Sequence, residues 1–469
     1  MPNDTTYRNP VRSWILNAPL AAFIALLVIC MLGGGASRGD VLSLVYVRPA
    51  AIICIAFLLL LPLRREFRPL RAPLILLGGL ALLMCAQLVP LPPSLWASLP
   101  GHDRYAELVA LSDSADAWRP LSLTPDLTIG SLLTLAFPLA GLLAYASMTP
   151  PQRALLLPIL LIAACASALF GIVQVTGNPH GPAFLYNITH EGSSVGFFAN
   201  RNHQAVFLAI SFPMLRAWTL MPHPDAAYAR LRAWIALGVG TLLVPLLLVT
   251  GSRAGIFLGI VGILAAYLLA PRNRLLSGFQ SRTIGILFLA IPIALTGFVI
   301  LLGRAIAIDR LISLDYLAAE ARVEFAPITL AMARDFFPFG TGFGAFDAVF
   351  RGYEPDATLS PQYLNHAHND LIELAITGGL PALILLLILL VWMTRRIWFA
   401  LRAKRGGATA LRARLAAATI LILFLQSLVD YPLRTPLLAL VFAILCGWLS
   451  DARRTSGEVE SAAKSAPPD

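Results

Sequence analysis

The segment NHAHNDLIELAITGGLPALILLLILLVW (residues 365–392) decides how this chain folds. Its first part is polar and contains two histidines, whereas the part from Ala382 to Trp392 is continuously apolar. The sequence Gly378-Gly379-Leu380-Pro381 separates the two parts. Ionisable residues beside a membrane helix are costly and are by default functional. We therefore expect a membrane helix in this segment, with a chemical site at its polar end.

The composition predicts an all-α polytopic membrane protein. Hydrophobic residues make up 58% of the chain and charged residues 13%, and the mean hydropathy is +0.76. These values lie outside the range of soluble globular chains. Because crossing a bilayer core takes roughly 20 apolar residues, the apolar windows predict about twelve transmembrane helices. They lie near Leu16, Val41, Leu74, Leu127, Ala154, Gln204, Ala233, Gly255, Ile284, Leu380, Leu415 and Leu433.

The first apolar run raises the question of a signal peptide, because Arg8 and Arg12 precede it. A signal peptide ends in a small-residue cleavage site of the A-x-A type. No convincing site of this type follows before Arg38. We interpret the run as a retained first helix.

The distribution of charge predicts which loops face the cytoplasm. With twelve spans, both termini lie on one side. The loops of that side and the terminal segments carry a net charge of about +16, and the alternate loops carry about −6, which together give the formal +10. By the positive-inside rule the basic side is cytoplasmic. The basic cluster from Arg395 to Arg414 is then a contact for anionic membrane lipids, and no nucleic-acid partner is expected.

The cysteines and acidic residues give no sign of a metal site. Cys30, Cys54, Cys85, Cys165 and Cys446 all fall within apolar runs, where they act as packing residues. Their spacing fits neither a zinc site nor a disulfide framework. The loops predicted to face outward contain no Asp-x-Asp motif. The sequence therefore predicts a reaction that needs no metal and no other cofactor.

The chain divides into four predicted regions. Residues 1–302 carry nine transmembrane helices with short loops, and residues 303–373 form a long outward loop that carries catalytic elements. Residues 374–450 carry the last three helices, and residues 451–469 are predicted to be a disordered cytoplasmic tail. A connecting segment as long as 303–373 is usually functional or disordered.

The long loop is predicted to be partly helical. From Leu317 to Met332 apolar residues recur at helical spacing, and Pro338 breaks the pattern soon afterwards. The glycines of Gly340-Thr341-Gly342-Phe343-Gly344 are reminiscent of a phosphate-binding loop, but the Gly-Lys-Ser/Thr of such loops is missing. We interpret this stretch as a glycine turn that lets backbone segments approach closely.

Several motifs occur together and in a fixed order along the chain. They are Gly196-Phe197-Phe198-Ala199-Asn200-Arg201-Asn202-His203, Thr250-Gly251-Ser252-Arg253-Ala254-Gly255, Gly340 to Gly344, His368-Asn369 with Leu371, and Gly378-Gly379-Leu380. In this combination the chain resembles the O-antigen ligase and polymerase superfamily, bacterial glycosyltransferases that use lipid-linked sugars. The resemblance implies a GT-C-like, multi-pass protein of the bacterial inner membrane, with cytoplasmic termini and a periplasmic active site.

The resemblance also implies roles for individual residues. It assigns His368 to catalysis, and Arg253 and Arg322 to the diphosphate of the donor. Guanidinium groups pair bidentately with phosphate oxygens, and imidazole exchanges protons near neutral pH. If Arg322 is instead paired with its acidic neighbours, Arg334 is the substitute. Supporting roles are expected for His366, Asn369, Arg201, His203, Arg334, Asp430 and Arg434.

The expected function is transfer of a glycan from undecaprenyl diphosphate to a hydroxyl of an acceptor glycan, lipid A-core, with inversion at the anomeric carbon. A polymerase of O-antigen or exopolysaccharide has the same chemistry, and the sequence does not separate the two. A transporter is the alternative from another class, because carriers also have about twelve spans. Carriers usually show an internal repeat and ionisable residues near mid-membrane, and neither pattern is evident here.

Overall fold

A computed structural model of the 469-residue chain describes the backbone of residues 10–112, 116–178, 180–269, 315–359, 364–402 and 407–452. Side chains are described from Ile15 onward and, in the fourth of these ranges, from Glu324 onward. The expected span near Ile284 and the start of the long loop at Gly303 lie outside the described residues, as does the tail after Ala452.

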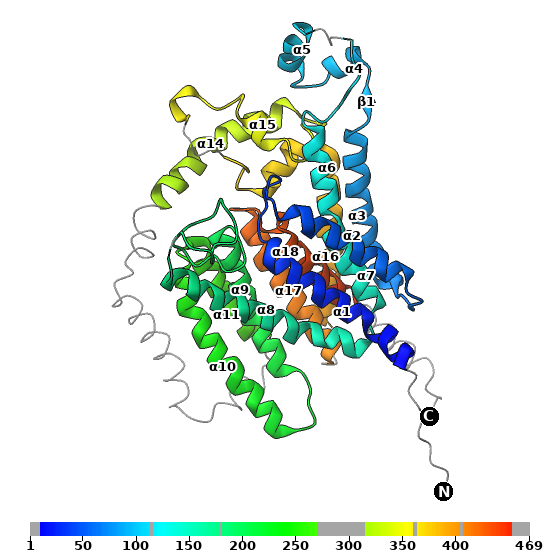
Figure 1. Cartoon of the computed structure of the whole chain (residues 1–469), viewed down its shortest axis with the longest axis vertical. Coiled ribbons are helices and arrows are strands. Elements are labelled where there is room, and N and C mark those ends of the chain that lie inside the picture. Colours follow the sequence, from blue (N-terminus) through cyan, green and yellow to red (C-terminus); the bar gives the residue numbers. More distant parts are fainter. Residues whose placement is uncertain are drawn as a thin grey trace.

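The described structure is a bundle of helices with one two-stranded sheet (Figure 1). The sheet pairs β1 (Pro90–Leu91) antiparallel with β2 (Arg119–Pro120). The helices of the first half are α1 (Pro10–Gly33), α2 (Leu44–Leu60), α3 (Phe67–Gln87), α4 (Pro93–Ala97), α5 (Asp103–Ala110), α6 (Pro125–Thr134), α7 (Ala136–Ser147), α8 (Pro150–Thr176) and α9 (Arg201–Leu220). Those of the second half are α10 (Ala226–Val249), α11 (Arg253–Leu268), α14 (Asp315–Asp335), α15 (Phe346–Phe350), α16 (Asp370–Arg402), α17 (Ala408–Ser427) and α18 (Pro436–Ser450), with 3-10 turns η3 (Asp356–Thr358) and η4 (Pro432–Arg434).

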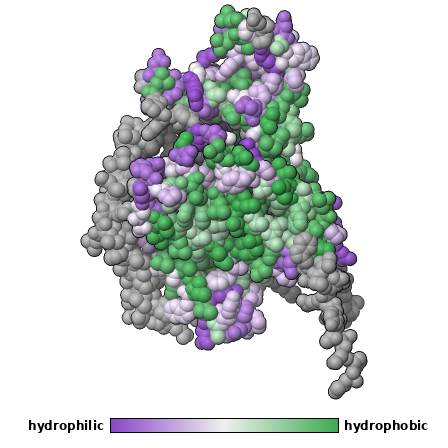
Figure 2. Space-filling view, in the orientation of Figure 1, coloured by the Kyte–Doolittle hydropathy of each residue, from purple (hydrophilic) through white to green (hydrophobic). Residues whose placement is uncertain are grey.

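The prediction of an all-α polytopic membrane protein is confirmed. Within the described residues, seven helical segments are long and apolar enough to cross a membrane, and three further apolar helices, α2, α11 and α18, are shorter. With α9 they account for eleven of the twelve expected positions, each of which lies inside one of these helices or within three residues of its start. The surface has a broad hydrophobic band between two hydrophilic ends (Figure 2). The hydrocarbon core of a lipid bilayer would cover such a band, because an outward-facing apolar surface of this extent is stable in an apolar surrounding and not in water.

Alternate connections of the chain meet on one face of the bundle, which we call the upper face after its place in Figure 1. The connection after α1 bonds to that before α9, since the Ala199 amide donates to the Gly35 carbonyl at 3.2 Å. The connection after α3 bonds to that after α14, since the Leu123 amide donates to the Thr341 carbonyl at 3.0 Å. The remaining alternate connections join them at the candidate site described below.

The other connections meet on the opposite, lower face. Arg153 at the start of α8 pairs with Glu66, which precedes α3, at 3.1 Å and with Asp451, which follows α18, at 3.4 Å. The Tyr145 hydroxyl donates to the same Asp451 carboxylate at 2.7 Å. Loops that alternate in sequence therefore segregate to two faces, as they must when successive helices cross one membrane.

A break inside α16 seats the glycine loop that follows α14. Gly379 has a φ of +60°, and a Cβ atom there would collide with the Pro338 carbonyl oxygen. The Thr341 amide donates to Ile376 O at 2.8 Å, and the Leu380 amide donates to Pro338 O at 2.8 Å. Gly340 has a φ of +78°, and its own Cβ would lie 2.7 Å from Thr377 O. The glycines thus permit close approach of two backbones, which confirms the interpretation as a glycine turn.

Candidate functional site

Tyr431, in the turn between α17 and α18, is the centre of a cluster of histidines on the upper face. Three imidazole rings surround its phenol ring: the centroid distances are 4.2 Å to His366, 5.1 Å to His368 and 5.4 Å to His203. His203 comes from the first turn of α9, and the other two precede α16. The fold therefore gathers three of the predicted histidines around one aromatic side chain.

His366 is held by a buried carboxylate. Its Nδ1 lies 2.8 Å from Oε1 of Glu373, which is one turn into α16 and 1% exposed. The other oxygen of Glu373 accepts the Ala367 amide at 2.8 Å. With Nδ1 engaged in this way, Nε2 is the nitrogen left for exchange with a substrate.

Arg434 completes this acidic cluster. Its Nη1 lies 3.0 Å from Glu373 Oε1 and its Nε donates to Asp370 Oδ1 at 2.9 Å. Burial by itself lowers the pKa of Arg434, but the carboxylates of Glu373 and Asp370 outweigh it and raise the pKa above the ordinary value. The guanidinium remains charged and fixes the ends of α16 and η4 together.

His368 faces a second buried carboxylate. Its Nδ1 lies 3.7 Å from Oδ1 of Asp430, and Nε2 of His203 lies 3.8 Å from the same oxygen. These are ion-pair distances and too long for hydrogen bonds. Burial opposes ionisation of Asp430, yet the two imidazoles prevail and hold the pKa of this carboxyl well below its usual range. His368 itself has a φ of +50°, an unusual conformation for a residue with a side chain.

Asn369 is the residue that caps α16 directly after His368. Its Oδ1 accepts the amides of Leu371 and Ile372 at 3.0 and 3.1 Å, which caps α16. Its Nδ2 donates to the Leu428 carbonyl at 3.1 Å and so ties this cap to the end of α17. These hydrogen bonds of Asn369 fix the backbone next to His368.

Asp430 also connects the histidines to two arginine-bearing helices. Its Oδ2 accepts Nδ2 of Asn202 at 2.7 Å and Nδ2 of Asn200, the cap of α9, at 3.3 Å. The Asn202 Oδ1 in turn accepts the hydroxyl of Ser252, the cap of α11, at 2.7 Å. The residues that follow the two caps are Arg201 and Arg253, each the first residue of its helix.

The positions of the remaining predicted residues are as follows. Arg253 is exposed at the upper end of α11, and Arg201 is partly buried. His190 lies near Arg201. Burial, and after it the positive charge of Arg201, lowers the pKa of His190 to about 4. Arg334 is exposed in the last turn of α14. Arg322 lies on α14, and its side chain is outside the described part of the structure.

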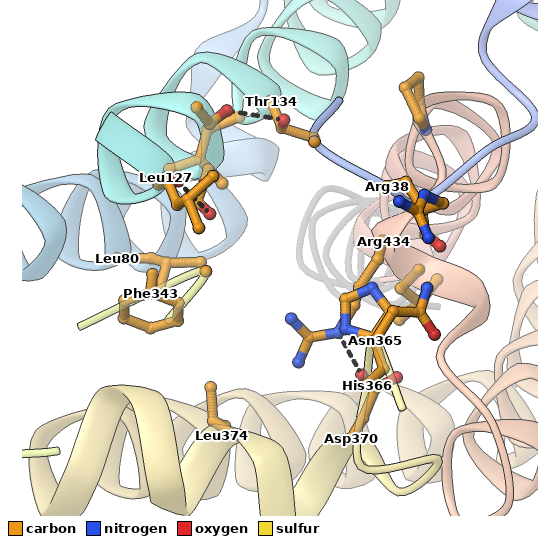
Figure 3. Close-up of a pocket in the computed structure, with 18 of the residues that line it drawn as sticks. Arg38, Leu80, Leu127, Thr134, Phe343, Asn365, His366, Asp370, Leu374 and Arg434 are labelled. Carbon is orange, nitrogen blue, oxygen red and sulfur yellow. Dashed lines mark hydrogen bonds and ion pairs between the residues drawn. The ribbon is translucent and has the colours of Figure 1, made fainter. Parts of the chain in front are cut away.

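A cavity of about 910 Å³ opens beside this cluster (Figure 3). Its polar wall includes His366, Asn365, Asp370 and Arg434, whereas His368 and Arg253 do not line it. Two further arginines of the wall, Arg38 and Arg48, were not singled out from the sequence. Arginines are disfavoured in loops predicted to face outward, where Arg38 lies, and inside apolar helices, where Arg48 lies. Those unusual locations were the available signal.

Comparison with known proteins agrees with this description. A search of curated proteins found no match. Residues 237–387 match the family model described as O-Antigen ligase. The matched segment contains Arg253, the glycine loop and both histidines before α16, and it confirms the resemblance to the O-antigen ligase superfamily that the sequence motifs predict.

Proposed function

We propose that the protein is an O-antigen ligase-type glycosyltransferase, which moves a glycan from undecaprenyl diphosphate to a hydroxyl of lipid A-core. The observation that carries the proposal is His368, with Nδ1 turned to the buried Asp430 carboxylate. An imidazole in this arrangement keeps Nε2 for the acceptor hydroxyl, and the nearby negative charge stabilises the imidazolium that forms when it takes a proton.

In the proposed reaction, His368 Nε2 accepts the hydroxyl proton while the hydroxyl oxygen attacks the anomeric carbon. The bond from that carbon to the diphosphate oxygen breaks, and the leaving undecaprenyl diphosphate keeps the electron pair. Attack from the opposite face inverts the anomeric centre. No metal or nucleotide takes part, because the diphosphate already activates the donor.

Arg253 and Arg322 are proposed to bind the donor diphosphate. Charge grows on the diphosphate as the bond breaks, so a guanidinium placed there stabilises the transition state more than the ground state. The link from Ser252 through Asn202 to Asp430 supports a role for Arg253, since it fixes the start of α11 to the carboxylate behind His368. His366, Arg201, His203, Arg334 and Arg434 are proposed as supporting residues.

We also propose that the upper face is periplasmic, and that both termini are cytoplasmic in the bacterial inner membrane. The support is the excess of Lys and Arg in the loops that meet on the lower face. In this orientation residues 303–373 form the periplasmic loop that carries catalytic elements, between helices of residues 1–302 and 374–450.

The proposal is tested by complementing a deletion strain with the wild type, His368→Ala or Arg253→Ala. Arg230→Ala is the matched control, because Arg230 is an exposed arginine at the lower end of α10. Loss of a general base typically lowers a rate about 100-fold or more, and loss of a group that stabilises transition-state charge lowers it by about 100-fold or more as well. Both test variants should therefore lose surface polysaccharide at equal protein levels. The control should retain it.

The gel pattern of the deletion strain identifies the reaction. Polymer that accumulates on the lipid carrier and is missing from lipid A-core identifies a ligase. Single repeats still attached to lipid A-core identify a polymerase, the alternative with the same chemistry. Unchanged glycans in the deletion strain would overturn the glycosyltransferase proposal and favour transport.

A further inference from the structure

The side chain of Tyr431 lies where two histidine–carboxylate pairs meet. Its ring centroid is 4.2 Å from that of His366, the partner of Glu373. It is 5.1 Å from that of His368, which faces Asp430. The two imidazole planes are tilted by 47° and 53° to the phenol plane. Tyr431 is only 6% exposed, so these contacts are largely shielded from water.

The aromatic ring is the part of Tyr431 that these contacts involve. The hydroxyl lies 3.4 Å from Asn365 Oδ1, which is a long and weak hydrogen bond. The backbone acts separately, because the Tyr431 amide donates to Asp430 Oδ1 at 3.0 Å whatever the side chain is. What the side chain presents to His366 and His368 is therefore its π system.

An aromatic ring attracts a cation through the negative charge of its π face, over distances of up to about 6 Å from the ring centroid. His366 and His368 both lie within that distance of Tyr431. The attraction is stronger where water is excluded. A ring in this place favours an imidazolium over a neutral imidazole.

We propose that Tyr431 is a positioning residue whose ring stabilises the protonated forms of His368 and His366. The consequence for catalysis rests on the proposed transfer reaction. As the acceptor hydroxyl gives its proton to His368, positive charge appears 5.1 Å from the ring centroid, so the ring stabilises the transition state more than the ground state. No bond to Tyr431 forms or breaks. Tyr431 lies outside the segment 237–387 that matches the family model.

Other charged and titratable groups also face the two imidazoles, from several elements. On the side of His368 they are Asp430, His203, Arg201 and His190. On the side of His366 they are Glu373, Asp370 and Arg434. The cavity beside His366 adds the pairs Arg38–Asp40 and Arg351–Asp347, together with Arg48 and Asp126. A change at position 431 removes none of these groups, so it isolates the effect of the ring.

The test that does not depend on transfer activity is chemical modification of the two histidines. Diethyl pyrocarbonate attacks neutral imidazole, and its reaction with His366 and His368 is followed against pH by peptide mass spectrometry of the purified full-length protein. Their side chains are 14% and 19% exposed, so the reagent can reach them. Tyr431→Phe keeps the ring and should keep the pH at which modification is half-maximal.

Replacement of Tyr431 by trifluorophenylalanine changes the charge of the π face at nearly constant shape. Because a weaker π face stabilises the imidazolium less, the pH of half-maximal modification should fall by about 0.5 to 1 unit. Tyr431→Leu, which has no π face, should shift it in the same direction. Phe346 is the control position, since it stacks on Phe350 at 5.6 Å in α15, and trifluorophenylalanine there should cause no shift.

The second measurement is the pH dependence of glycan transfer in detergent with lipid-linked donor and lipid A-core from the deletion strain. With trifluorophenylalanine at position 431, kcat should fall about three- to tenfold while KM stays within about twofold. The acid limb of the profile should move to lower pH by about 0.5 to 1 unit. A purely structural role would lower the rate at every pH and leave the limb in place.

The two measurements separate this proposal from the proposed function. An unchanged pH of half-maximal modification with trifluorophenylalanine at position 431 would overturn the role of the ring, as would an equal shift from the Phe346 control. Absence of transfer by the wild type would overturn the proposed function, and the modification result would still decide whether the ring stabilises the imidazolium.

Discussion

Asp430 is the residue on which the site most depends, because its carboxylate is fully buried between His203 and His368. Its lowered pKa means that ionised Asp430 stabilises the fold at every pH above its unfolded value of about 3.9. This contribution is lost only as the pH falls through the lowered, folded value. We expect Asp430→Asn to lower the free energy of unfolding by about 3 kcal/mol at pH 6, since it removes the buried carboxylate that faces His203 and His368.

The measurement is the Tm of wild type and Asp430→Asn between pH 6 and pH 3. The difference in Tm should be present above about pH 4 and shrink below it. Asp347→Asn is the control, because its pair with Arg351 is partly exposed and should contribute less than about 1 kcal/mol. A difference that grows as the pH falls, or an Asp430 effect no larger than the control, contradicts the assignment.

At the scale of single residues, the sequence singled out side chains that the structure brings together, but it did not predict their partners. The pattern His-Asn-x-Leu drew attention to His368 and His366, and the structure brings both to Tyr431. The carboxylate behind His368 is 62 residues further along the chain, at Asp430, and that pairing depends on the packing of α16 against the α17–α18 turn. Packing of this kind leaves no local pattern, so the sequence supplied Asp430 only as a supporting residue.

At the scale of elements, the break in α16 makes a prediction about glycine. Gly379→Ala should prevent correct folding, because a left-handed φ costs about 1–3 kcal/mol for a residue with a side chain and the new Cβ would also meet the Pro338 carbonyl. Gly78→Ala is the matched control: Gly78 is inside α3, and nothing lies within 4 Å of its Cβ position. Alanine there should stabilise the helix by about 1 kcal/mol or be neutral.

These two variants are compared by Tm and by the monodisperse fraction in size-exclusion chromatography. A Gly379→Ala protein as stable as the control would show that α16 does not need its break. Both changes add the same methyl group to a helix of the bundle, at Gly78 in α3 and at Gly379 in α16. A difference between the two variants therefore reports on the backbone conformation and contact at Gly379.

Local patterns predicted most elements well, for physical reasons that the structure makes clear. The helix expected from Leu317 to Met332 is α14, from Asp315 to Asp335, because apolar spacing at the helical period directly reflects a packed face. The lengths of α2, α11 and α18 were not foreseen: they have 17, 16 and 15 residues, fewer than a bilayer-spanning window. Helix ends depend on the capping residues and on tertiary contacts, which a hydropathy window does not register.

At the scale of the whole molecule, charge and hydrogen bonding agree on how the loops are sorted. The positive-inside rule divided the loops by counting Lys and Arg, and the structure divides the described loops in the same way through backbone contacts such as Ala199 to Gly35 above and Glu66 to Ala146 below. The two criteria are independent, because loop charge plays no part in the backbone contacts. The sequence alone did not determine which loops of one side touch, since this depends on how the helices pack.

This sorting leads to a prediction about orientation in the membrane. In a background with the five cysteines replaced by serine, Glu107→Cys places a thiol on exposed α5 of the upper face, and Arg230→Cys places one at the exposed lower end of α10. In spheroplasts, a membrane-impermeant maleimide should label position 107 at once and position 230 only after the membrane is permeabilised. The reverse pattern would put the His368 cluster in the cytoplasm, where a periplasmic transfer reaction is impossible, while labelling of both positions before permeabilisation would contradict a membrane between the two faces.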